Sequence, residues 1–228
     1  MKQYGFGSVN ESRAITSEEM RAKENRGVAI GISRLSMMEI AGGAIARFVA
    51  DRFSGKTNVL LVAGTGNNGG DAFVAARHLL YWENFEVTLA LIGKEADIHK
   101  SEALTNWKIL KKIPKADKME IDSMEKSALF GKALVESQVV VSAIFGTGFR
   151  GKPKELQSSV IKMINDSKTT KISVDIPSGM EADSGNYEIA VLSDYTITMD
   201  SPKIGMLAND KSRKVCGKII VANIGVPL

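Results

Sequence analysis

The chain has 228 residues, of which 44% are hydrophobic and 25% are charged, and its formal net charge is +4. This composition can fill one large core or two small ones, and so mild a positive charge does not by itself indicate a nucleic-acid groove. The one cysteine, Cys216, excludes an internal disulfide framework and a multi-cysteine zinc site. The two histidines, His78 and His99, are too few for a histidine-rich metal centre.

No stretch approaches about 18 consecutive apolar residues, and the first residues lack a hydrophobic signal core. We therefore expect a cytoplasmic protein. Much of the positive charge lies in a run of lysines with a single aromatic neighbour, Trp107, which is typical of a solvated face rather than of a nucleic-acid groove: Lys108, Lys111, Lys112, Lys115 and Lys118. His78 is expected to be partly buried on a helix.

Two capping boxes predict a pair of N-terminal helices. Thr16-x-x-Glu19 predicts a helix from Ser17 to about Arg26 that stops at Gly27. Ser36-x-x-Glu39 predicts a second helix that runs to about residue 53. Gly42-Gly43 inside it suggests that another backbone passes close by. We expect this pair to cover a sheet edge or to form a subunit interface.

From Val59 onward, strands and helices alternate. Strands are predicted at 59–63, 85–92, 118–121, 138–145, 171–176, 195–199 and 218–223, and helices at about 71–82, 100–112, 124–136 and 153–165. This alternation predicts an α/β fold with a mostly parallel, doubly wound sheet. After Pro177 the helices are expected to stop, and the last two strands to extend one edge of the sheet. Residues 1–228 are expected to form one domain.

The first strand ends in a turn with four glycines, after which a helix begins. This layout places backbone N–H groups where they face an anion. Gly64-x-Gly66-x-x-Gly69 also satisfies the dinucleotide fingerprint, which requires an acidic residue about 20 positions further on. Residues 88–92 occupy that place and are apolar. The sequence therefore favours a nucleotide phosphate site over an ordinary nicotinamide dehydrogenase.

Two further strands end in unusual turns, at 146–153 and 175–179. In an open α/β sheet, ligands bind beyond the carboxyl ends of the strands, where the strand order reverses. In the common order 3-2-1-4-5, the three strands that end in these turns are neighbours. We therefore expect the turns to line one crevice, with an adenosine diphosphate-type ligand between residues 64–71 and 146–152.

The second turn imitates a phosphate loop, because Gly146-x-x-x-x-Gly151-Lys152 matches that pattern. Pro153 stands where a magnesium-binding Ser or Thr belongs, and it suits the first position of a helix better. A Walker-type ATPase is therefore disfavoured. Arg150 and Lys152 still suit a phosphate, and the alternative is a plain glycine-rich connection.

The third turn supplies polar groups. Asp175 can accept hydrogen bonds from ribose hydroxyls or act as a general base, and Asn68 and Ser178 offer the neutral oxygens that a hard cation prefers. The alternative is that Asp175 and Ser178 only bond to the local backbone, as Asp and Ser often do in turns.

Five blocks of sequence carry a resemblance to a known family. They are residues 67–79, 143–148, 174–179 and 201–205, together with Met38-Glu39 and Ala41-Gly42 near the N-terminus. With these blocks in register over nearly its whole length, the chain resembles the NAD(P)H-hydrate epimerase family, also called the YjeF N-terminal domain family. The resemblance implies a Rossmann-like three-layer α/β/α fold, usually dimeric.

The resemblance also implies a function. Such proteins interconvert the R and S forms of NADHX and NADPHX, hydrated nicotinamide cofactors, and work with a separate or fused dehydratase; we expect no fused dehydratase here. A potassium ion is implied at Asn68 and Ser178. The residues implied to contact the substrate are Asn67, Asn68, Gly69, Gly70, Asp71, Gly146, Thr147, Gly148, Phe149, Arg150, Gly151, Lys152 and Asp175.

Two positions depart from the family pattern. Ser142 stands where the family has an Asp of its potassium and active site, and Ile40 replaces an Asn. A serine hydroxyl is no base near neutral pH without an activator, and it offers a cation no negative charge. Asp175 therefore remains the candidate catalytic residue, and Ser142 is a weak metal ligand. The resemblance leaves open a working or weakened epimerase, or a catalytically silent nucleotide-binding and dimerising module.

Overall fold

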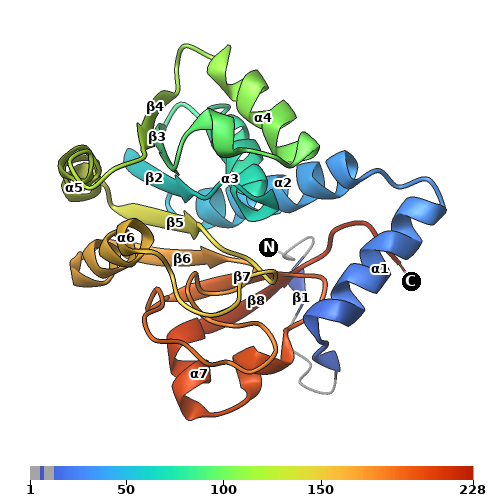
Figure 1. The fold of residues 1–228 in the computed structure, drawn as a ribbon. Coiled ribbons are helices and arrows are strands. Elements are labelled where there is room, and N and C mark those ends of the chain that lie inside the picture. The colour runs from blue at the N-terminus through green and yellow to red at the C-terminus, as the bar shows by residue number, and fades with distance from the viewer. Residues whose placement is uncertain (1–5, 8–12, 228) are drawn as a thin grey trace.

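The computed structural model describes residues 6–7 and 13–227. Its central sheet has eight strands in the order β1-β8-β7-β6-β5-β2-β3-β4 (Figure 1). Strands β2 to β8 pair in parallel, and β1 pairs antiparallel with β8. The strands are β1 (Phe6–Gly7), β2 (Thr57–Ala63), β3 (Phe85–Ile92), β4 (Asp117–Ile121), β5 (Val139–Ala143), β6 (Thr170–Val174), β7 (Tyr195–Met199) and β8 (Lys218–Ala222).

The strand order confirms the doubly wound sheet. Strands β4-β3-β2-β5-β6 reproduce the predicted order 3-2-1-4-5, and β7 and β8 extend the edge beyond β6. Strand β2 is buried on both faces, because alternate residues such as Leu60 and Leu61 pack into two different clusters. The order reverses between β2 and β5, so the predicted position for a ligand lies at their carboxyl ends.

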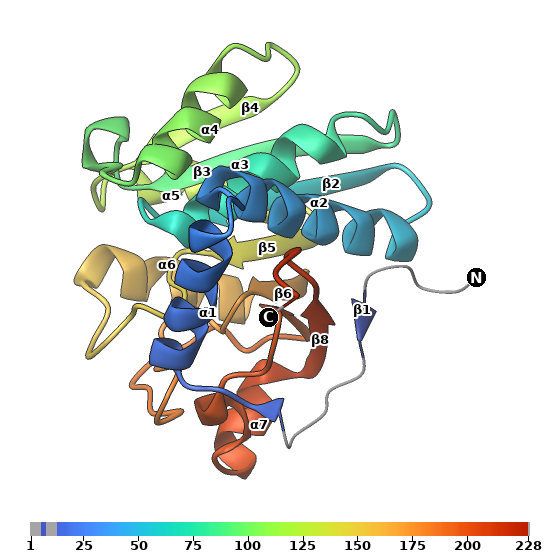
Figure 2. The same ribbon diagram turned by 90° about the vertical axis from the view of Figure 1, so that its right-hand side faces the viewer.

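Helices cover both faces of the sheet. On one face lie α2 (Arg34–Arg52), α3 (Asn67–Leu79) and α4 (Ser101–Lys111), and on the other lie α5 (Ser127–Glu136) and α6 (Glu155–Asp166) (Figure 1). This is the expected α/β/α sandwich. Helix α1 (Ser17–Ala29) belongs to neither layer: it lies beyond the carboxyl ends of the central strands, in front of them in Figure 2.

The N-terminal helices confirm one capping prediction and correct another. The hydroxyl of Thr16 accepts a bond from the Glu19 amide at 3.1 Å, and the Glu19 carboxylate accepts one from the Thr16 amide at 2.7 Å, as predicted. Helix α1 does not stop at Gly27, contrary to the prediction. It continues to Ala29, and Gly27 is buried within it. The N-cap of α2 is Ser33, which accepts a bond from the amide of Ser36 at 3.0 Å, so Ser36 is not the cap.

The close backbone approach predicted at Gly42-Gly43 is present, and it lies within the chain. A Cβ at Gly42 would stand 2.4 Å from the Cβ of Val74 in α3. Met37 and Met38 are also buried in the core. The packing of α2 therefore requires no second subunit.

Other boundaries differ from prediction. Helix α3 begins at Asn67 rather than at Asp71, so Gly69 and Gly70 are helical. Strands β5 and β6 end at Ala143 and Val174, two residues earlier than expected. The N-cap of α6 is Lys154, so Pro153 precedes the helix.

Helices do not stop after Pro177. The short helix α7 (Asp210–Cys216) lies between β7 and β8, where its N-cap Asn209 accepts a bond from the Ser212 amide at 3.0 Å. Short 3-10 turns are found at Glu95–Asp97 and Ile204–Leu207. Among the described residues, no single helix is long and apolar enough to cross a membrane; α1 and α2 reach that length only as a pair bent by 119°.

Candidate functional site

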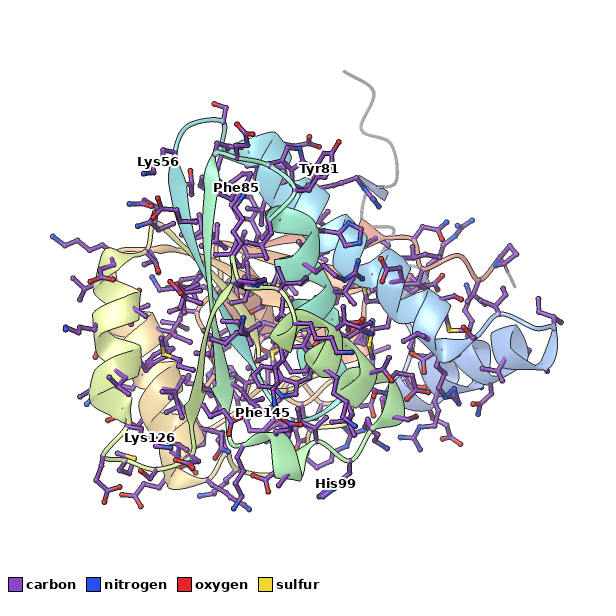
Figure 3. The ribbon with its side chains drawn as sticks, turned by 90° about the horizontal axis from the view of Figure 1, so that it is seen from above. Lys56, Tyr81, Phe85, His99, Lys126 and Phe145 are labelled. Carbon is purple, nitrogen blue, oxygen red and sulfur yellow. The ribbon has the colours of Figure 1, made fainter. Side chains whose placement is uncertain are left out.

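The three unusual turns meet at one crevice, as predicted. It has a volume of about 940 Å³ and is lined by Gly64–Asn68 and Asp71, by residues 144–150 and by Asp175. Figure 3 shows Phe145 and His99 at the end of the molecule where it lies, with Lys56 and Phe85 at the opposite end. The crevice therefore opens at the carboxyl ends of β2, β5 and β6.

Helix α1 forms a wall of the crevice that the motifs did not indicate. One face of the helix lines the cavity with Ser17, Met20, Arg21 and Glu24. The spacing of three or four residues places these side chains on one face. The capping box predicted the helix, but nothing local in the sequence indicates that it folds back over the strand ends.

Backbone packing explains two glycines of the first turn. A Cβ at Gly64 would stand 2.0 Å from the carbonyl oxygen of Ile144, and one at Gly69 would stand 1.9 Å from that of Gly64. A Cβ at Gly66, in contrast, would meet no described heavy atom within 4 Å beyond its chain neighbours. Gly66 is the N-cap of α3 and makes no side-chain cap. The first turn of α3 therefore presents amide groups to the crevice, an arrangement that suits a phosphate.

The second turn is fixed by Arg150. Its guanidinium donates to the Ser17 hydroxyl and the Asp183 carboxylate, both at 2.7 Å, and to the carbonyl oxygens of Thr147 and Phe149. Asp183 also accepts bonds from the amide and the hydroxyl of Ser17. Arg150 therefore joins this turn to the start of α1.

Four of the residues predicted to contact the substrate do not line the crevice: Gly69, Gly70, Gly151 and Lys152. Lys152 is exposed and pairs with Glu188, and a Cβ at Gly70 would meet Met38. Phe145 and Phe149, which do line the crevice, stack with ring centroids 4.5 Å apart. The remaining predicted residues are brought together.

Asp175 is held from two sides. Its backbone φ is 66°, and its Oδ2 accepts a bond from the Thr147 amide at 3.0 Å. Its Oδ1 lies 2.7 Å from the Nζ of Lys203, whose side chain is 0% exposed. Lys203 belongs to one of the five sequence blocks but was not predicted as a site residue, because a lone lysine in a loop gives no sign of burial.

Two more carboxyl groups line the crevice, on α3 and α1. Burial, and then the charge of Asp175, raise the pKa of Asp71 well above its usual range, and the same two causes raise the pKa of Glu24. The crevice thus places a carboxylate paired with a buried lysine beside two carboxyl groups whose pKa values are raised. Such a set can take up and deliver protons.

Asn68, which lines the crevice, and Ser178, which does not, both donate to the carbonyl oxygen of Phe145, and Ser142 lies next to Ser178. The Asn68 Nδ2 donates to the carbonyl oxygens of Phe145 at 2.8 Å and Val174 at 3.2 Å. Its Oδ1 is buried and has no hydrogen-bond partner among the described residues. The Ser178 hydroxyl accepts bonds from the amides of Ile144 and Phe145, and from the Ser142 hydroxyl at 3.3 Å.

The histidine and cysteine predictions concern residues outside the crevice. His78 is partly buried, as predicted, and its Nε2 lies 2.7 Å from the Glu39 carboxylate. Burial raises the pKa of the Cys216 thiol to about 12, so this residue is no ready nucleophile. In the part of the chain that the structure describes, no three His, Cys, Asp or Glu side chains are placed to hold a metal ion.

Asp71→Asn is expected to stabilise the fold at alkaline pH. A carboxyl whose pKa is raised by folding stabilises the fold below its unfolded pKa of about 3.9, and this contribution is lost as the pH rises through the raised pKa. Asparagine does not ionise, so the variant should gain in Tm over the native chain at about pH 9 and much less at about pH 5. Each 1 kcal/mol corresponds to about 2–4 °C. Asp51→Asn, at an exposed position, is the control; equal gains at both pH values would contradict the prediction.

Comparison with known proteins decides the family. The family model described as YjeF-related protein N-terminus matches residues 34–205. The chain belongs to this family. The resemblance seen in the five sequence blocks is therefore confirmed.

Curated relatives cover nearly the whole chain. It is 37% identical over 214 residues to the NAD(P)H-hydrate epimerase of Cenarchaeum symbiosum, covering 93% of this chain and 95% of that protein. It is 38% identical to the bifunctional NAD(P)H-hydrate repair enzyme Nnr of Archaeoglobus fulgidus, over 93% of this chain and 42% of that enzyme. The chain thus spans about two fifths of the bifunctional relatives and nearly all of the shorter one.

A solved structure agrees with the fold. The crystal structure of yeast YNL200c superposes with a TM-score of 0.74, covering 85% of this chain and 83% of that chain at 21% identity. At this identity, the likeness supports the α/β architecture alone.

Proposed function

We propose that the chain is an isomerase that interconverts the R and S forms of NADHX and NADPHX, as an NAD(P)H-hydrate epimerase. The observation that carries this proposal is the crevice, in which Asp175 lies beside the glycine turns at the strand ends. A relative named NAD(P)H-hydrate epimerase, of nearly the same length, supports it. The resemblance gave the same function.

The site offers the groups that such a reaction requires. The hydrated carbon carries a hydroxyl group, and it can invert if that group leaves as water and water returns from the other face. One proton must then reach the leaving oxygen, and one must be removed from the returning water. In our proposal, the carboxyl of Asp71 delivers the first proton and the carboxylate of Asp175 accepts the second.

A coupled assay tests the function. The purified chain is incubated with R-NADPHX and a dehydratase that accepts the S form alone, and absorbance is followed at the wavelength of the reduced cofactor. An epimerase accelerates the recovery of absorbance beyond the spontaneous rate. The same assay with R-NADHX gives the preference between the two substrates.

Asn68 and Ser178, at the floor of the crevice, fit a potassium ion. Asn68 Oδ1 is buried without a partner among the described residues, and the Ser178 hydroxyl adds an oxygen. Oxygen donors of this kind suit hard cations. We propose that Asn68 and Ser178 hold the ion, that Ser142 contributes weakly, and that the ion supplies positive charge at the floor of the crevice.

Ser142→Asp is expected to increase both the potassium dependence and the epimerisation rate. Ser142 is 1% exposed, so a carboxylate there requires a cation or donors to remain ionised. We expect some loss of stability without potassium. The measurement is the rate against potassium concentration for both proteins, with Ser173→Asp, in the adjacent strand, as the control. A native chain that is already fast and clearly potassium-dependent would contradict this account of Ser142.

A catalytically silent nucleotide-binding module is the second candidate, and Ser142 is the observation that favours it. Such a module binds NADP⁺ in the crevice but leaves the R and S forms unchanged. Calorimetry with NADP⁺ beside the coupled assay separates the two candidates. Binding without turnover would identify the silent module.

We also propose a cytoplasmic homodimer that works with a separate NAD(P)H-hydrate dehydratase. The corner between α1 and α2 exposes apolar side chains that support a subunit contact: Val28, Ile30, Leu35 and Ile40. The bifunctional names of relatives such as that of Archaeoglobus fulgidus support the link to a dehydratase. A monomer mass by light scattering at micromolar concentration would overturn the dimer.

A further inference from the structure

We propose that Lys203 is a positioning residue for Asp175. Its buried ammonium group fixes one carboxylate oxygen of Asp175, and this contact makes the Asp175 carboxylate the base of the crevice. The proposal rests on the function proposed above. It assigns Lys203 an action through Asp175 rather than through the ligand, since Lys203 is not among the residues that line the crevice.

The ammonium group of Lys203 has one acceptor for each of its three protons. It lies 2.7 Å from the Asp175 Oδ1, and it donates to the Thr198 hydroxyl at 3.0 Å and to the Met199 carbonyl oxygen at 2.9 Å. The whole residue is 0% exposed. A buried lysine charge is tolerated where it is paired and fully hydrogen-bonded, and this site meets both conditions.

The carboxylate of Asp175 is fixed in turn. Lys203 holds Oδ1 and the Thr147 amide holds Oδ2, while the side chain remains 13% exposed at the crevice. The backbone φ of 66° adds a second constraint, because few residues adopt this region. The lysine thus orients a carboxylate that still reaches the cavity.

Charge gives the lysine a second effect. Asp71 and Glu24 line the same crevice as Asp175. Because like charges and burial both disfavour ionisation, the three carboxyl groups cannot all ionise easily. An ammonium group in contact with one carboxylate favours the ionised form of that group over its neighbours. Burial and the charge of Asp175 raise the pKa values of Asp71 and Glu24, and the more distant charge of Lys203 opposes this rise only in part. Lys203 therefore pairs with one carboxylate of the three and leaves Asp71 and Glu24 without an ion pair to a cation among the described residues, a difference of environment of the kind that acid–base catalysis uses.

Lys203→Met tests the proposal, because methionine keeps the apolar length and removes the charge. We expect kcat/KM for epimerisation to fall at least about 100-fold and the acid limb of its pH profile to move to higher pH. Lys23→Met is the matched control: Lys23 pairs with Asp200 at 2.9 Å, outside the crevice lining. We expect it to change kcat/KM less than about threefold.

A double substitution keeps the test valid if Lys203→Met fails to fold. Lys203→Met combined with Asp175→Asn removes both charges, so no unpaired charge remains buried. If Lys203 acts through Asp175, this double variant and Asp175→Asn alone have the same kcat/KM. A further loss in the double variant, or an unmoved acid limb in Lys203→Met, would overturn the proposal.

Carboxyl carbon NMR on aspartate-labelled protein separates this inference from the proposed function. The Asp175 signal, assigned by its loss in Asp175→Asn, should titrate at higher pH in Lys203→Met than in the native chain. This measurement requires no turnover. If the native chain is inactive but Lys203→Met shows this shift, Lys203 is a positioning residue and the epimerase proposal is wrong. If the native chain is active but Lys203→Met shows no shift, the epimerase proposal stands and the positioning role of Lys203 is wrong.

Discussion

Asp175→Asn is expected to lower kcat for epimerisation by about 10²–10⁴-fold, the usual contribution of a positioned acid or base. Asparagine suits this test for a backbone reason. Asp175 has a φ of 66°, a region that asparagine adopts more readily than alanine does. The amide oxygen still accepts a hydrogen bond from Lys203, while the proton-accepting carboxylate is lost.

The chain also supplies a matched control for this substitution. Asp200 has a φ of 64° and pairs with Lys23, so Asp200→Asn makes the same chemical change in the same backbone region. It lies outside the crevice lining, and we expect kcat to stay within about threefold. Rates are normalised to the folded fraction measured by circular dichroism, because Lys203 loses its counter-charge in Asp175→Asn. Equal losses in the two variants would remove Asp175 from the proposed chemistry.

Gly69→Ala is expected to destabilise the fold by about 3 kcal/mol or more, since the new Cβ would stand 1.9 Å from a backbone oxygen that cannot move freely. For a chain of this size, this corresponds to a loss of about 6–12 °C in Tm. A valine at this position would likewise disturb the turn itself. It would not obstruct the ligand, because Gly69 does not line the crevice.

Gly66→Ala is the control in the same turn. A Cβ at Gly66 meets no described heavy atom within 4 Å beyond its chain neighbours, so stability should fall by no more than about 1 kcal/mol, the cost of alanine at the N-cap of α3. Because Gly66 lines the crevice, we expect weaker binding of NADP⁺ in this variant. Thermal unfolding and calorimetry on both variants check the pair. A stable Gly69→Ala protein with unchanged affinity would contradict the description of the turn.

The parts of the fold that repeat a local pattern were predictable from sequence. Apolar runs such as Val59–Ala63 followed by helical periodicity predicted the parallel sheet, and the rule for strand order then brought three turns into one crevice. The start of α3 was not predictable from local preference, because Asn-Asn-Gly-Gly favours a turn. Packing of Gly69 against the Gly64 carbonyl and of Gly70 against Met38 places these residues in the helix.

Only part of the candidate site was predictable, because local sequence patterns mark some of its residues and not others. The turn residues carry patterns of their own, whereas α1 and Lys203 reach the site through tertiary contacts. Arg150 binds Ser17 across 133 positions of sequence, and Lys203 reaches Asp175 from the loop that follows β7. Neither contact has a local signature, since a surface lysine and a buried one look alike in a sequence.

The most direct measurement of the central claim is the conversion of one epimer into the other. Pure R-NADPHX is incubated with the chain at neutral pH, and the R and S forms are resolved by chromatography over time, with no dehydratase present. The account predicts that the mixture reaches its R/S equilibrium much faster with the chain than without it, and that Asp175→Asn abolishes most of the difference. Equal rates with and without the native chain, in a preparation that binds NADP⁺, would contradict the claim.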